Sequence, residues 1–458
     1  MMTLTLCEIA KAVGGTLNRN GDSVACGIST DSRTVKENEV FVALRGAKFD
    51  GHDFIPALKG KCCAVLSEKP VSDQPCILVR DTLKALGLLA AYWKRRVAPQ
   101  VTVGVTGSVG KTTTKELIAS VLKEKYKTHF TSGNLNNHIG VPITLIRIES
   151  GCEAVVCEMG MSGRGEIAYL TGLVRPNLAV ITNIGTSHME LLGSREEILR
   201  AKLEILEGME KGSTIILDGD EPLLRSETVR ELTKDYRVLY VGFHTENHIY
   251  PMDIYKGKGD ISFDVVADEA EFRVTVPAVG DHFVKDALFA VAVGLLLGVS
   301  PEGIAAGLMS YSPAGLRQRI YRKDEFCVIA DCYNASPESM KASLKVLADF
   351  KGRKLAVLGD MLELGSISQK AHTEVGKWVY ENGIDLLFCG GKNAKWIAEG
   401  ALLAGMPEER IVFSENQKDL AESIKKSLRA EDHVLFKASN SMRFEELIAL
   451  CDLTEYEN

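Results

Sequence analysis

A glycine-rich turn near residue 110 is the feature whose residue types point most directly to chemistry. It connects an apolar, strand-like run, VTVGVT, to a helical pattern, KTTTKELIASVL. Glycines let successive backbone N–H groups face one anion, a following helix adds its positive end, a lysine reaches phosphate oxygens, and a threonine hydroxyl can ligate Mg²⁺. The sequence therefore predicts a nucleotide phosphate site. Its residues are Gly107, Ser108, Gly110, Lys111, Thr112 and Thr113.

One alternative to this site remains, because Val105 stands where the usual G-x-x-x-x-G-K-[ST] pattern has its first glycine. An ordinary strand-to-helix turn has the same outline. Two polar residues at the ends of apolar strands favour the phosphate site: Glu158 ends AVVCE, and His188 follows LAVITNIG. Singly they read as a solvated strand-end glutamate and a surface-loop histidine. Because ligands collect at the carboxyl ends of parallel strands, together with the turn they indicate metal ligation.

Two further features carry weaker signals. Lys202 lies in the helical run SREEILRAKLEILEGM among several glutamates, and this pattern is typical of a solvated helix lysine. The segment TSGNLNNHIGVP, which contains Asn137, can offer amide contacts to phosphate or metal, although Asn and Gly clusters also make turns. These residues by themselves predict an ATP- and Mg²⁺-dependent enzyme, with a P-loop kinase or regulatory NTPase as one possible class.

The pattern of strands and helices that must position these residues predicts an α/β protein of three domains. The chain has 458 residues, about three times an average domain. Residues 1–98 mix short strands and helices, as in a smaller α+β domain. Residues 99–312 alternate apolar strands and helices as parallel βαβ units do, which predicts a central P-loop ATPase domain, with antiparallel hairpins from Tyr250 to Gly280. Residues 313–458 alternate again, which predicts a Rossmann-like domain.

Composition and charge exclude several classes of protein. Hydrophobic residues make up 45% and charged residues 25%, which is ordinary for a globular chain and unlike disordered or fibrous ones. The net charge of −7 leaves no excess of cations for a nucleic-acid backbone. No apolar run is long enough to span a membrane, and the start does not resemble a signal peptide. Eleven cysteines, several inside apolar strands, indicate reduced thiols and a cytoplasmic location.

The motifs around these residues resemble the Mur ligase family over all three blocks. The matching segments are STDSRTVKENEVFVALRGAKFDGHDF, TGSVGKTTTK, GNLNNHIGVPITL, EMGMSGRGEIAYL, NIGTSHMELLGSREEILRAKLEI, DCYNASPESMKASL, LGDMLELGSISQKAHTEVG and SMRFEEL. The G-K-T-T run is also similar to folylpolyglutamate synthetase, whereas GNLNNxIGVP, DCYNAxPxSM and GDMLELG resemble the branch that adds D-alanyl-D-alanine. The DSR…DGH pattern of the first block argues against the folate enzyme.

The resemblance implies a reaction and its partners. ATP, with two Mg²⁺ ions, would phosphorylate the free carboxylate of UDP-N-acetylmuramoyl-tripeptide, and the amine of D-alanyl-D-alanine would attack the acyl phosphate. Such chemistry depends on positioning and on cationic stabilisation of crowded negative charge. A monomer in the cytoplasm is expected, with no nucleic acid and no membrane span. Another amino-acid-adding relative is the alternative within the family.

The resemblance also implies a role for individual residues. Lys111 matches the phosphate lysine, Thr112 a ligand of the first Mg²⁺, and Glu158 and His188 ligands of the second. Lys202 matches a lysine that Mur ligases carbamylate, which is a catalytic and metal-binding role and replaces the solvated reading. The residues expected to contact nucleotide or substrate are Asn137, Arg317, Asp331 and Asn334 in the cleft and Ser32 and Arg33 in the first domain, near the UDP part.

Two segments depart from the family pattern. The usual H-N-x-x-N-A-L reads HFVKDAL at residues 282–288, so Phe283 and Asp286 replace both asparagines. Near the end of the chain, the usual K-G-S-R reads KASN, so Asn440 replaces an arginine. These are the places where contacts made by the family residues are not expected to transfer.

Overall fold

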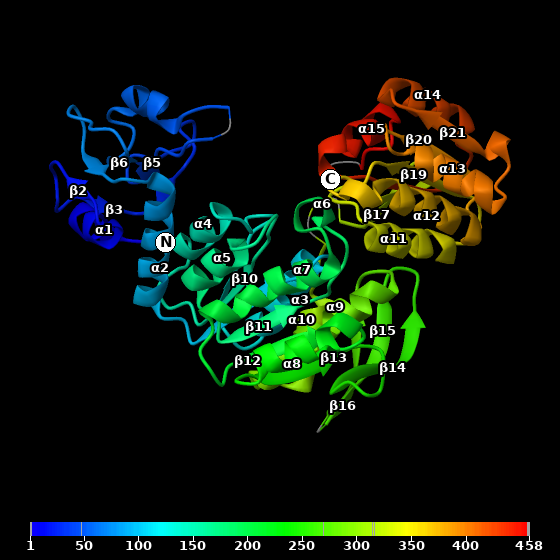
Figure 1. Ribbon diagram of the computed structural model, residues 1–458, viewed down its shortest axis with the longest axis horizontal. Helices are drawn as coiled ribbons and strands as arrows, with labels where there is room; N and C mark the ends of the chain where they lie inside the picture. Colours follow the sequence, from blue (N-terminus) through cyan, green and yellow to red (C-terminus); the bar gives the residue numbers. More distant parts are fainter. Residues whose placement is uncertain (1, 47, 269, 314, 316, 456–458) are drawn as a thin grey trace.

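The chain folds into three successive bodies. The computed structural model describes residues 2–46, 48–268, 270–313, 315 and 317–455. Figure 1 shows the first body in blue, the second in cyan to green, and the third in yellow to red, with the outer two standing apart on either side of the middle one. Each β-sheet of the described residues lies within one of the three.

The first body holds a two-stranded sheet, β1-β3, and a five-stranded sheet of order β2-β7-β6-β5-β4, in which only β2 runs antiparallel to its neighbour. Its elements are β1 (Leu4–Thr5), α1 (Leu6–Val13), β2 (Thr16–Leu17), β3 (Val24–Ala25), β4 (Ile28–Ser29), β5 (Val40–Val42), η1 (Gly51–Leu58), β6 (Ala64–Ser67), β7 (Cys76–Leu78) and α2 (Thr82–Val97). The Thr5 side chain and Glu8 form a capping box that starts α1.

The second body is built on a nine-stranded sheet of order β16-β15-β14-β13-β12-β11-β8-β10-β9. Its elements are β8 (Val101–Thr106), α3 (Lys111–Lys123), β9 (Thr128–Phe130), α4 (Gly140–Ile146), β10 (Ala154–Glu158), α5 (Glu166–Val174), β11 (Leu178–Ile181), α6 (Met189–Leu192), α7 (Arg195–Leu203), η2 (Glu204–Gly208), β12 (Thr214–Asp218), η3 (Pro222–Arg225), α8 (Glu227–Thr233), β13 (Arg237–Val241), β14 (Ile249–Lys256), β15 (Ile261–Ala267), β16 (Ala270–Val276), α9 (Asp281–Leu296) and α10 (Pro301–Met309).

Pairing in this sheet is parallel up to β14 and antiparallel beyond it, so the change of pattern predicted at Tyr250 is confirmed. From β8 the chain moves to β9 and β10 on one side and then to β11 and β12 on the other. The switch point therefore lies between β8 and β11. Ligands of open α/β sheets bind at this place, outside the carboxyl ends of the strands.

The third body has a six-stranded sheet of order β17-β18-β22-β19-β20-β21, parallel except for the edge strand β17. Its elements are β17 (Arg319–Lys323), β18 (Phe326–Ala330), α11 (Pro337–Asp349), β19 (Lys354–Gly359), η4 (Gly365–Ile367), α12 (Ser368–Glu381), β20 (Leu386–Gly390), α13 (Lys395–Ala404), η5 (Glu408–Arg410), β21 (Ile411–Ser414), α14 (Gln417–Ser427), β22 (His433–Lys437), η6 (Asn440–Met442) and α15 (Phe444–Leu450).

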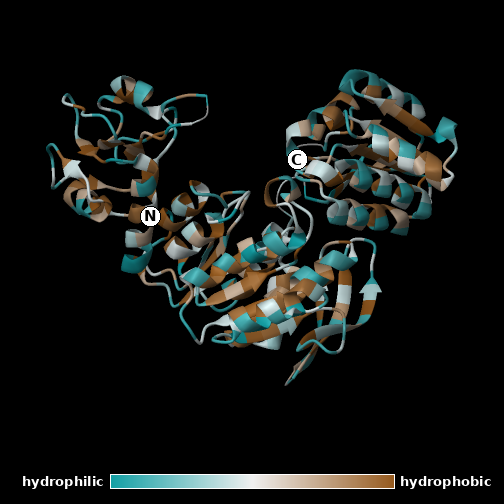
Figure 2. Ribbon diagram, viewed as in Figure 1, coloured by the Kyte–Doolittle hydropathy of each residue, from teal (hydrophilic) through white to brown (hydrophobic). Residues whose placement is uncertain are grey.

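The central strands are apolar because helices cover both faces of the sheets. Every residue of β8, β10 and β11 is buried, and these strands read as almost continuous Val, Ile and Ala runs. In Figure 2 the strands of the second and third bodies are mostly brown, while the outer helices alternate brown and teal. No helix in the described part of the chain is long and apolar enough to cross a membrane.

The outer bodies attach to the middle one in different ways. Helix α2 of the first body packs on α4 and α5, where the Trp93 Nε1 donates to the Ile148 carbonyl at 2.9 Å and the Lys94 Nζ to the Val174 carbonyl at 2.7 Å. The third body meets the second through polar contacts, among them the Lys256 Nζ to Asp349 carboxylate pair at 3.0 Å. Polar junctions of this kind are typical of domains that move relative to one another.

Candidate active site

The glycine turn follows β8 and starts α3, as predicted from the sequence. Gly107 has φ +152° and Gly110 has φ +84°, which are conformations that favour glycine. A Cβ added to Gly107 would lie 1.9 Å from the Thr182 Oγ1, so the close approach of β11 also requires glycine there. The Lys111 Nζ donates to the Gly107 and Ser108 carbonyls at 2.9 and 3.1 Å. The reading as an anion-binding turn fits this geometry.

The loop after β11 shapes the same turn from the other side. The Asn183 Oδ1 accepts from the backbone N–H groups of Ser108 and Val109 at 3.1 and 3.0 Å. The Thr182 Oγ1 donates to the Val109 carbonyl at 2.6 Å. These bonds occupy the first amides of the turn, so the N–H groups at the start of α3, which have no helical acceptor, are the ones left for an anion.

Glu158 is a buried carboxylate at the centre of the site. It is 1% exposed, so the reading as a solvated strand-end residue is wrong. Its Oε2 accepts from the Thr112 Oγ1 at 2.7 Å and its Oε1 from the Asn136 Nδ2 at 2.8 Å. Both partners are neutral, and a buried carboxylate without an adjacent cation is costly. Asn137 instead caps the start of α4 through the N–H groups of Ile139 and Gly140.

Lys202 is also buried, which excludes the reading as a solvated helix lysine. It is 1% exposed and forms no ion pair with a carboxylate of the described residues. Burial lowers the pKa of Lys202 well below its ordinary value, and the Lys111 ammonium lowers that pKa further. A fraction of the amine is therefore neutral, which is the form that reacts with CO₂.

His188 lies at the start of α6, where its side chain meets Glu363 of the third body. Its side chain is 22% exposed, and its Nδ1 lies 2.7 Å from the Glu363 Oε2. Burial lowers the pKa of His188, and the Glu363 carboxylate acts in the opposite direction. The reading as a surface-loop histidine is wrong, because the ring is enclosed between two bodies of the chain.

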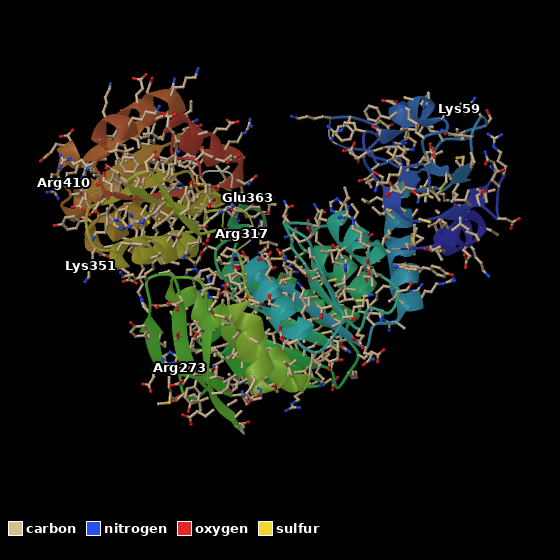
Figure 3. The ribbon with its side chains drawn as sticks, turned by 180° about the vertical axis from the view of Figure 1, so that it is seen from behind. Lys59, Arg273, Arg317, Lys351, Glu363 and Arg410 are labelled. Atoms are coloured by element: carbon tan, nitrogen blue, oxygen red, sulfur yellow. The ribbon has the colours of Figure 1, made fainter. Side chains whose placement is uncertain are left out.

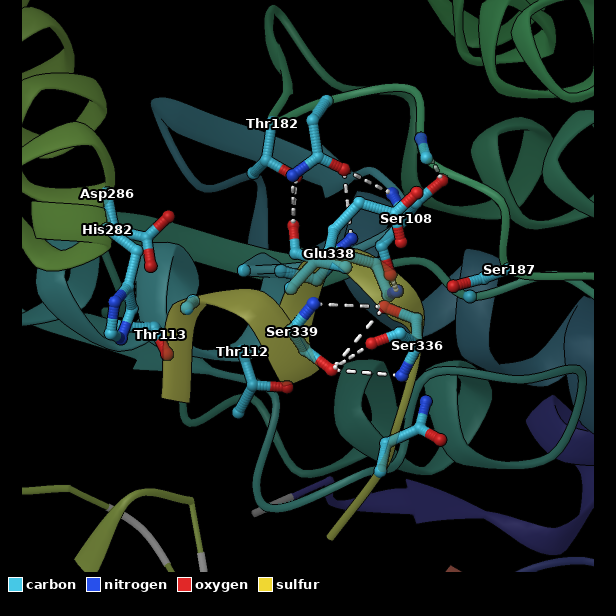
Figure 4. Close-up of a pocket in the computed structure, with 18 of the residues that line it drawn as sticks. Ser108, Thr112, Thr113, Thr182, Ser187, His282, Asp286, Ser336, Glu338 and Ser339 are labelled. Carbon is cyan, nitrogen blue, oxygen red and sulfur yellow. Dashed lines mark hydrogen bonds between the residues drawn. The ribbon is translucent and has the colours of Figure 1, made fainter. Parts of the chain in front are cut away.

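A cavity of 810 Å³ connects these groups across the junction of the second and third bodies. This volume is within the range of sites that bind a small molecule or nucleotide. Figure 4 shows Glu338 of the third body close to Ser108 of the second. The Glu338 Oε1 accepts from the Thr186 N–H of the second body at 2.9 Å. The predicted site residues that line the cavity are Ser108, Gly110, Lys111, Thr112, Thr113, Asn137, Glu158, His188, Arg317, Asp331 and Asn334. Gly107 and Lys202 lie behind this lining, and Ser32 and Arg33 belong to the first body.

The third body contributes a charged cluster to the cavity wall. Burial alone would raise the pKa of Asp331, but the Lys437 ammonium, whose Nζ is 2.6 Å from the Asp331 Oδ2, holds it below its ordinary value. The Arg317 guanidinium lies 3.6 Å from the centre of the Tyr333 ring. Figure 3 shows Arg317 at the junction of the two bodies. The predicted cleft residues of the third body are therefore brought to the same cavity as the glycine turn.

Several polar residues of this site were not predicted from the sequence. Asn183 shapes the glycine turn, and Glu363 contacts His188. In the segment TSGNLNNHIGVP, which was expected to offer amide contacts, Asn136 and not Asn137 donates to Glu158. The Lys285 Nζ lies 3.0 Å from the Asp218 carboxylate on the cavity wall. Asn183 carries the same signal as Glu158, a polar residue directly after an apolar strand, so that signal could have identified it.

Asp286 stands where the family has asparagine, and it contacts the turn. Its Oδ1 accepts from the Thr114 Oγ1 at 3.1 Å and would lie 2.6 Å from a Cβ added to Gly110. Burial raises the pKa of Asp286 to about 7, against an ordinary value of 3.8, and the Thr114 hydroxyl opposes that shift. Folding is therefore linked to protonation of this carboxyl group.

We expect D286N to be more stable than the wild type, by a margin that grows as pH rises. The folded Asp286 holds its proton up to about pH 7 while the unfolded carboxyl loses it near pH 3.8, so the wild type loses stability as pH rises through that window. The advantage of the variant should grow by about 3 kcal/mol between pH 5 and pH 8. Urea unfolding of both proteins at pH 5 and pH 8 measures it, and an advantage that is constant with pH would contradict the assignment.

The donor set is suited to Mg²⁺ together with phosphate, and less to a metal held by protein alone. Among the described residues, no three His, Cys, Asp or Glu side chains lie close enough to hold a metal. Mg²⁺ usually takes one or two carboxylates and completes its shell with water and substrate phosphates. The Thr112 hydroxyl and the buried Glu158 carboxylate, 2.7 Å apart, fit that pattern.

Comparisons with known proteins agree with this arrangement. Residues 25–94 match the Mur ligase family catalytic domain, residues 105–294 the Mur ligase middle domain, and residues 317–440 the Mur ligase glutamate ligase domain. The chain is 40% identical over 458 residues to the UDP-N-acetylmuramoyl-tripeptide–D-alanyl-D-alanine ligase of Bacillus subtilis, covering 98% of each. Its fold matches the crystal structure of MurF from Acinetobacter baumannii with a TM-score of 0.91 at 31% identity, over 99% of each chain.

A further similar structure is MurF ligase from Thermotoga maritima in complex with ADP, with a TM-score of 0.82 at 30% identity over 93% of this chain and 96% of that one. The three matched domains follow one another along the chain in the same order as its three bodies. With a full-length relative at 40% identity, this chain belongs to the Mur ligase family.

Proposed function

We propose that this chain is an ATP-dependent ligase that adds D-alanyl-D-alanine to UDP-N-acetylmuramoyl-tripeptide in the synthesis of peptidoglycan precursors. The observation that carries the proposal is the shared cavity, in which the glycine turn, Glu158 and His188 of the second body face Asp331 and Asn334 of the third. An acyl-phosphate ligase needs such a closed junction, because water must be kept from the activated carboxyl group. The full-length relatives carry this activity in their names.

The reaction has two steps. The terminal carboxylate of the tripeptide attacks the γ-phosphorus of ATP, which forms the O–P bond of an acyl phosphate as the bond to ADP breaks. The amine of the dipeptide then attacks the acyl carbon, loses a proton, and expels inorganic phosphate. Lys111 at the glycine turn supplies positive charge beside the transferred phosphoryl group, and the amides at the start of α3 orient it.

We assign the cation site to Thr112 and Glu158 for one Mg²⁺ and to Glu158, His188 and a carbamylated Lys202 for a second. Mg²⁺ neutralises charge on the phosphates and orients them. The buried, unpaired amine of Lys202 supports carbamylation: its nitrogen bonds to CO₂, releases a proton, and becomes an anion where the site has few carboxylates. Asn137, Arg317 and Asp331 are the proposed nucleotide contacts.

The remaining proposals concern the domain boundaries and the place of the UDP part of the substrate. We place the domains at residues 1–98, 99–312 and 313–458, with the UDP part of the substrate on the first, near Ser32 and Arg33. Arg33 is 85% exposed and its guanidinium pairs with Asp31 at 2.7 Å, so it is available at the surface. We further propose a monomer that acts in the cytoplasm.

A second, smaller cavity is the proposed place for the dipeptide. It has a volume of 250 Å³ and lies outside the carboxyl ends of β18, β22 and β19, next to His188. Its polar lining comes from hydroxyl and amide groups, including Asn334, Ser439 and Asn440. It shares Ser187, His188, Asn334 and Ser336 with the large cavity, so an amine bound there faces the place where the acyl phosphate forms.

We expect N334A to raise the KM for D-alanyl-D-alanine about tenfold, while the KM for ATP changes little. Its Oδ1 bonds only to the adjacent Ala335 N–H at 2.9 Å, so the Nδ2 remains for substrate. The loss of one hydrogen bond to a charged or polar group corresponds to ~1.5 kcal/mol. Steady-state kinetics with each substrate varied in turn checks this, and equal increases in both KM values would contradict it.

One assay tests the proposed function against its alternatives. Purified protein is mixed with ATP, Mg²⁺, UDP-N-acetylmuramoyl-tripeptide and D-alanyl-D-alanine, and ADP and peptide products are followed by mass spectrometry. ADP release that needs both substrates and yields the pentapeptide supports the proposal. Parallel mixtures replace the dipeptide by single amino acids, or both substrates by folate and glutamate, and ligation there instead would indicate another amide ligase. ATP hydrolysis without amine would indicate an NTPase.

A further inference from the structure

A close contact between His188 and Glu363 joins the second body to the third. The His188 Nδ1 lies 2.7 Å from the Glu363 Oε2. The Nδ1 atom is buried and has no aligned hydrogen bond, so the pair is near but not yet in ideal geometry. The Glu363 side chain is 58% exposed. Figure 3 shows Glu363 at the edge of the third body that faces the second. The contact is therefore made only while the two bodies are docked.

The backbone on both sides of this contact is strained. His188 has φ 65° and Glu363 has φ 62°, in the left-handed region that non-glycine residues rarely adopt. Such conformations persist where the surrounding structure determines them. Here the Glu190 N–H donates to the Glu363 carbonyl at 3.1 Å. A Cβ at Gly365 would lie 2.9 Å from the Glu190 Cα. The two turns therefore hold each other.

The contact with Glu363 affects which ring nitrogen of His188 carries the proton. A metal-bound histidine usually donates its other ring N–H to a carboxylate, which fixes the tautomer and the ring orientation. An isolated neutral imidazole mainly carries its proton on Nε2, which blocks that atom as a ligand. A carboxylate at Nδ1 favours the other tautomer and leaves the Nε2 lone pair for a cation. His188 lines the cavity, and Nδ1 is the ring nitrogen that lies beside the Glu363 carboxylate.

We propose that Glu363 is a positioning residue that holds the His188 imidazole as the Nδ1–H tautomer, with Nε2 as its metal-binding atom. The third body then completes the cation site of the second by docking against it. This inference rests on the proposed function, because it takes His188 as a Mg²⁺ ligand. It assigns a role to a residue of the GDMLELG segment, 175 positions beyond the histidine in the chain.

The tautomer is measured directly by ¹⁵N NMR of the full chain labelled on histidine, with H188N assigning the signals of His188. In the wild type we expect the Nδ1 of His188 protonated and Nε2 not. In E363A the proton should move mainly to Nε2. In E363Q the amide oxygen can still accept from Nδ1–H, so the wild-type tautomer should return in large part. Because Glu363 is exposed, these variants are expected to fold.

The affinity of the second cation is measured by titrating Mn²⁺ in the presence of ADP and following it by electron paramagnetic resonance. E363A should weaken the weaker Mn²⁺ site about 10–100-fold, and E363Q should recover most of that loss. The matched control is D349A, which removes a carboxylate that pairs with Lys256 across the same junction and does not contact His188. Its tautomer and Mn²⁺ affinity should equal those of the wild type.

Three outcomes would overturn the inference: a wild-type His188 protonated on Nε2, an E363A variant with the wild-type tautomer and Mn²⁺ affinity, or equal effects of E363A and D349A. The last would mean that any weakening of the junction has the same effect. The NMR measurement needs no turnover. If the wild type shows the expected tautomer but does not join the dipeptide to the tripeptide, the result counts against the proposed function and not against the tautomer.

Discussion

Replacing Lys111 by alanine is expected to lower the rate of ligation about a hundredfold to a thousandfold, or ~3–4 kcal/mol in the transition state. Lys111 is the first residue of α3, beside the amides left for phosphate, and its ammonium contacts the turn itself. Phosphoryl transfer to a carboxylate brings negative charges together, so removing this charge affects the transition state more than binding. Single-turnover measurement of ADP formation, with the wild type in parallel, gives the size of the loss.

The K111A variant needs a control. The Nζ of Lys111 also donates to the Gly107 and Ser108 carbonyls, so its loss could loosen the turn. The K123A variant removes a lysine of the same helix whose Nζ lies 4.6 Å from the centre of the Phe130 ring, away from the cavity. We expect it to retain ligation. Thermal unfolding and ADP affinity of both variants separate a damaged turn from lost charge. Near-wild-type ligation by K111A would refute the assigned role.

The K202A variant is expected to lose at least about a hundredfold in ligation rate, or ~3 kcal/mol, and to recover part of it when formate or acetate is added. The reason is that alanine cannot form a carbamate, while a small carboxylate can enter the vacated space and supply the missing anion. Lys202 is 1% exposed and surrounded by protein, so the added anion would be retained there. Full activity without rescue would contradict carbamylation.

The carbamate itself can be observed without turnover. With ¹³C-bicarbonate, the wild type should give a carbamate signal in ¹³C NMR that is absent from K202A. Removal of CO₂ should lower the ligation rate of the wild type but not that of K202A. K94A is a matched control, because burial also lowers the pKa of Lys94, whose Nζ instead bonds to the Val174 carbonyl at 2.7 Å. Its carbamate signal should match that of the wild type.

Much of the fold could be predicted because its signals are local. The helical pattern TLKALGLLAAYWKRRV coincides with α2 (Thr82–Val97), and the apolar runs coincide with β8, β10 and β11. The strands that were not predicted include the two-residue strands β1 to β4 of the first body and the edge strands β9 (Thr128–Phe130) and β17 (Arg319–Lys323). Edge strands are solvated on one side, so their sequences lack the continuous apolar run that marks a covered strand.

The site was predicted in part, and the missing part has one cause. Lys111 and Glu158 belong to patterns of strand and turn, and the structure brings both to one cavity. Their roles stay predictions. Lys202 reads as a solvated lysine by pattern, because its burial depends on how α7 packs and not on its neighbours in sequence. Only the resemblance to the Mur ligases indicated its role. Asn183 follows an apolar strand and Asn136 lies in an asparagine-rich segment, but neither pattern tells which groups they contact. Glu363 has no spacing relation to His188, which it contacts.

The sequence by itself determined the alternation of the main strands and helices and the glycine turn between β8 and α3, because these depend on backbone conformation and on hydrophobic periodicity over a few residues. The tertiary structure alone decided which charges are buried without partners, as at Lys202, and which side chains meet across bodies, as at His188 and Glu363. Burial and electrostatic coupling act through space, and residues 175 positions apart carry no local pattern that reports their contact.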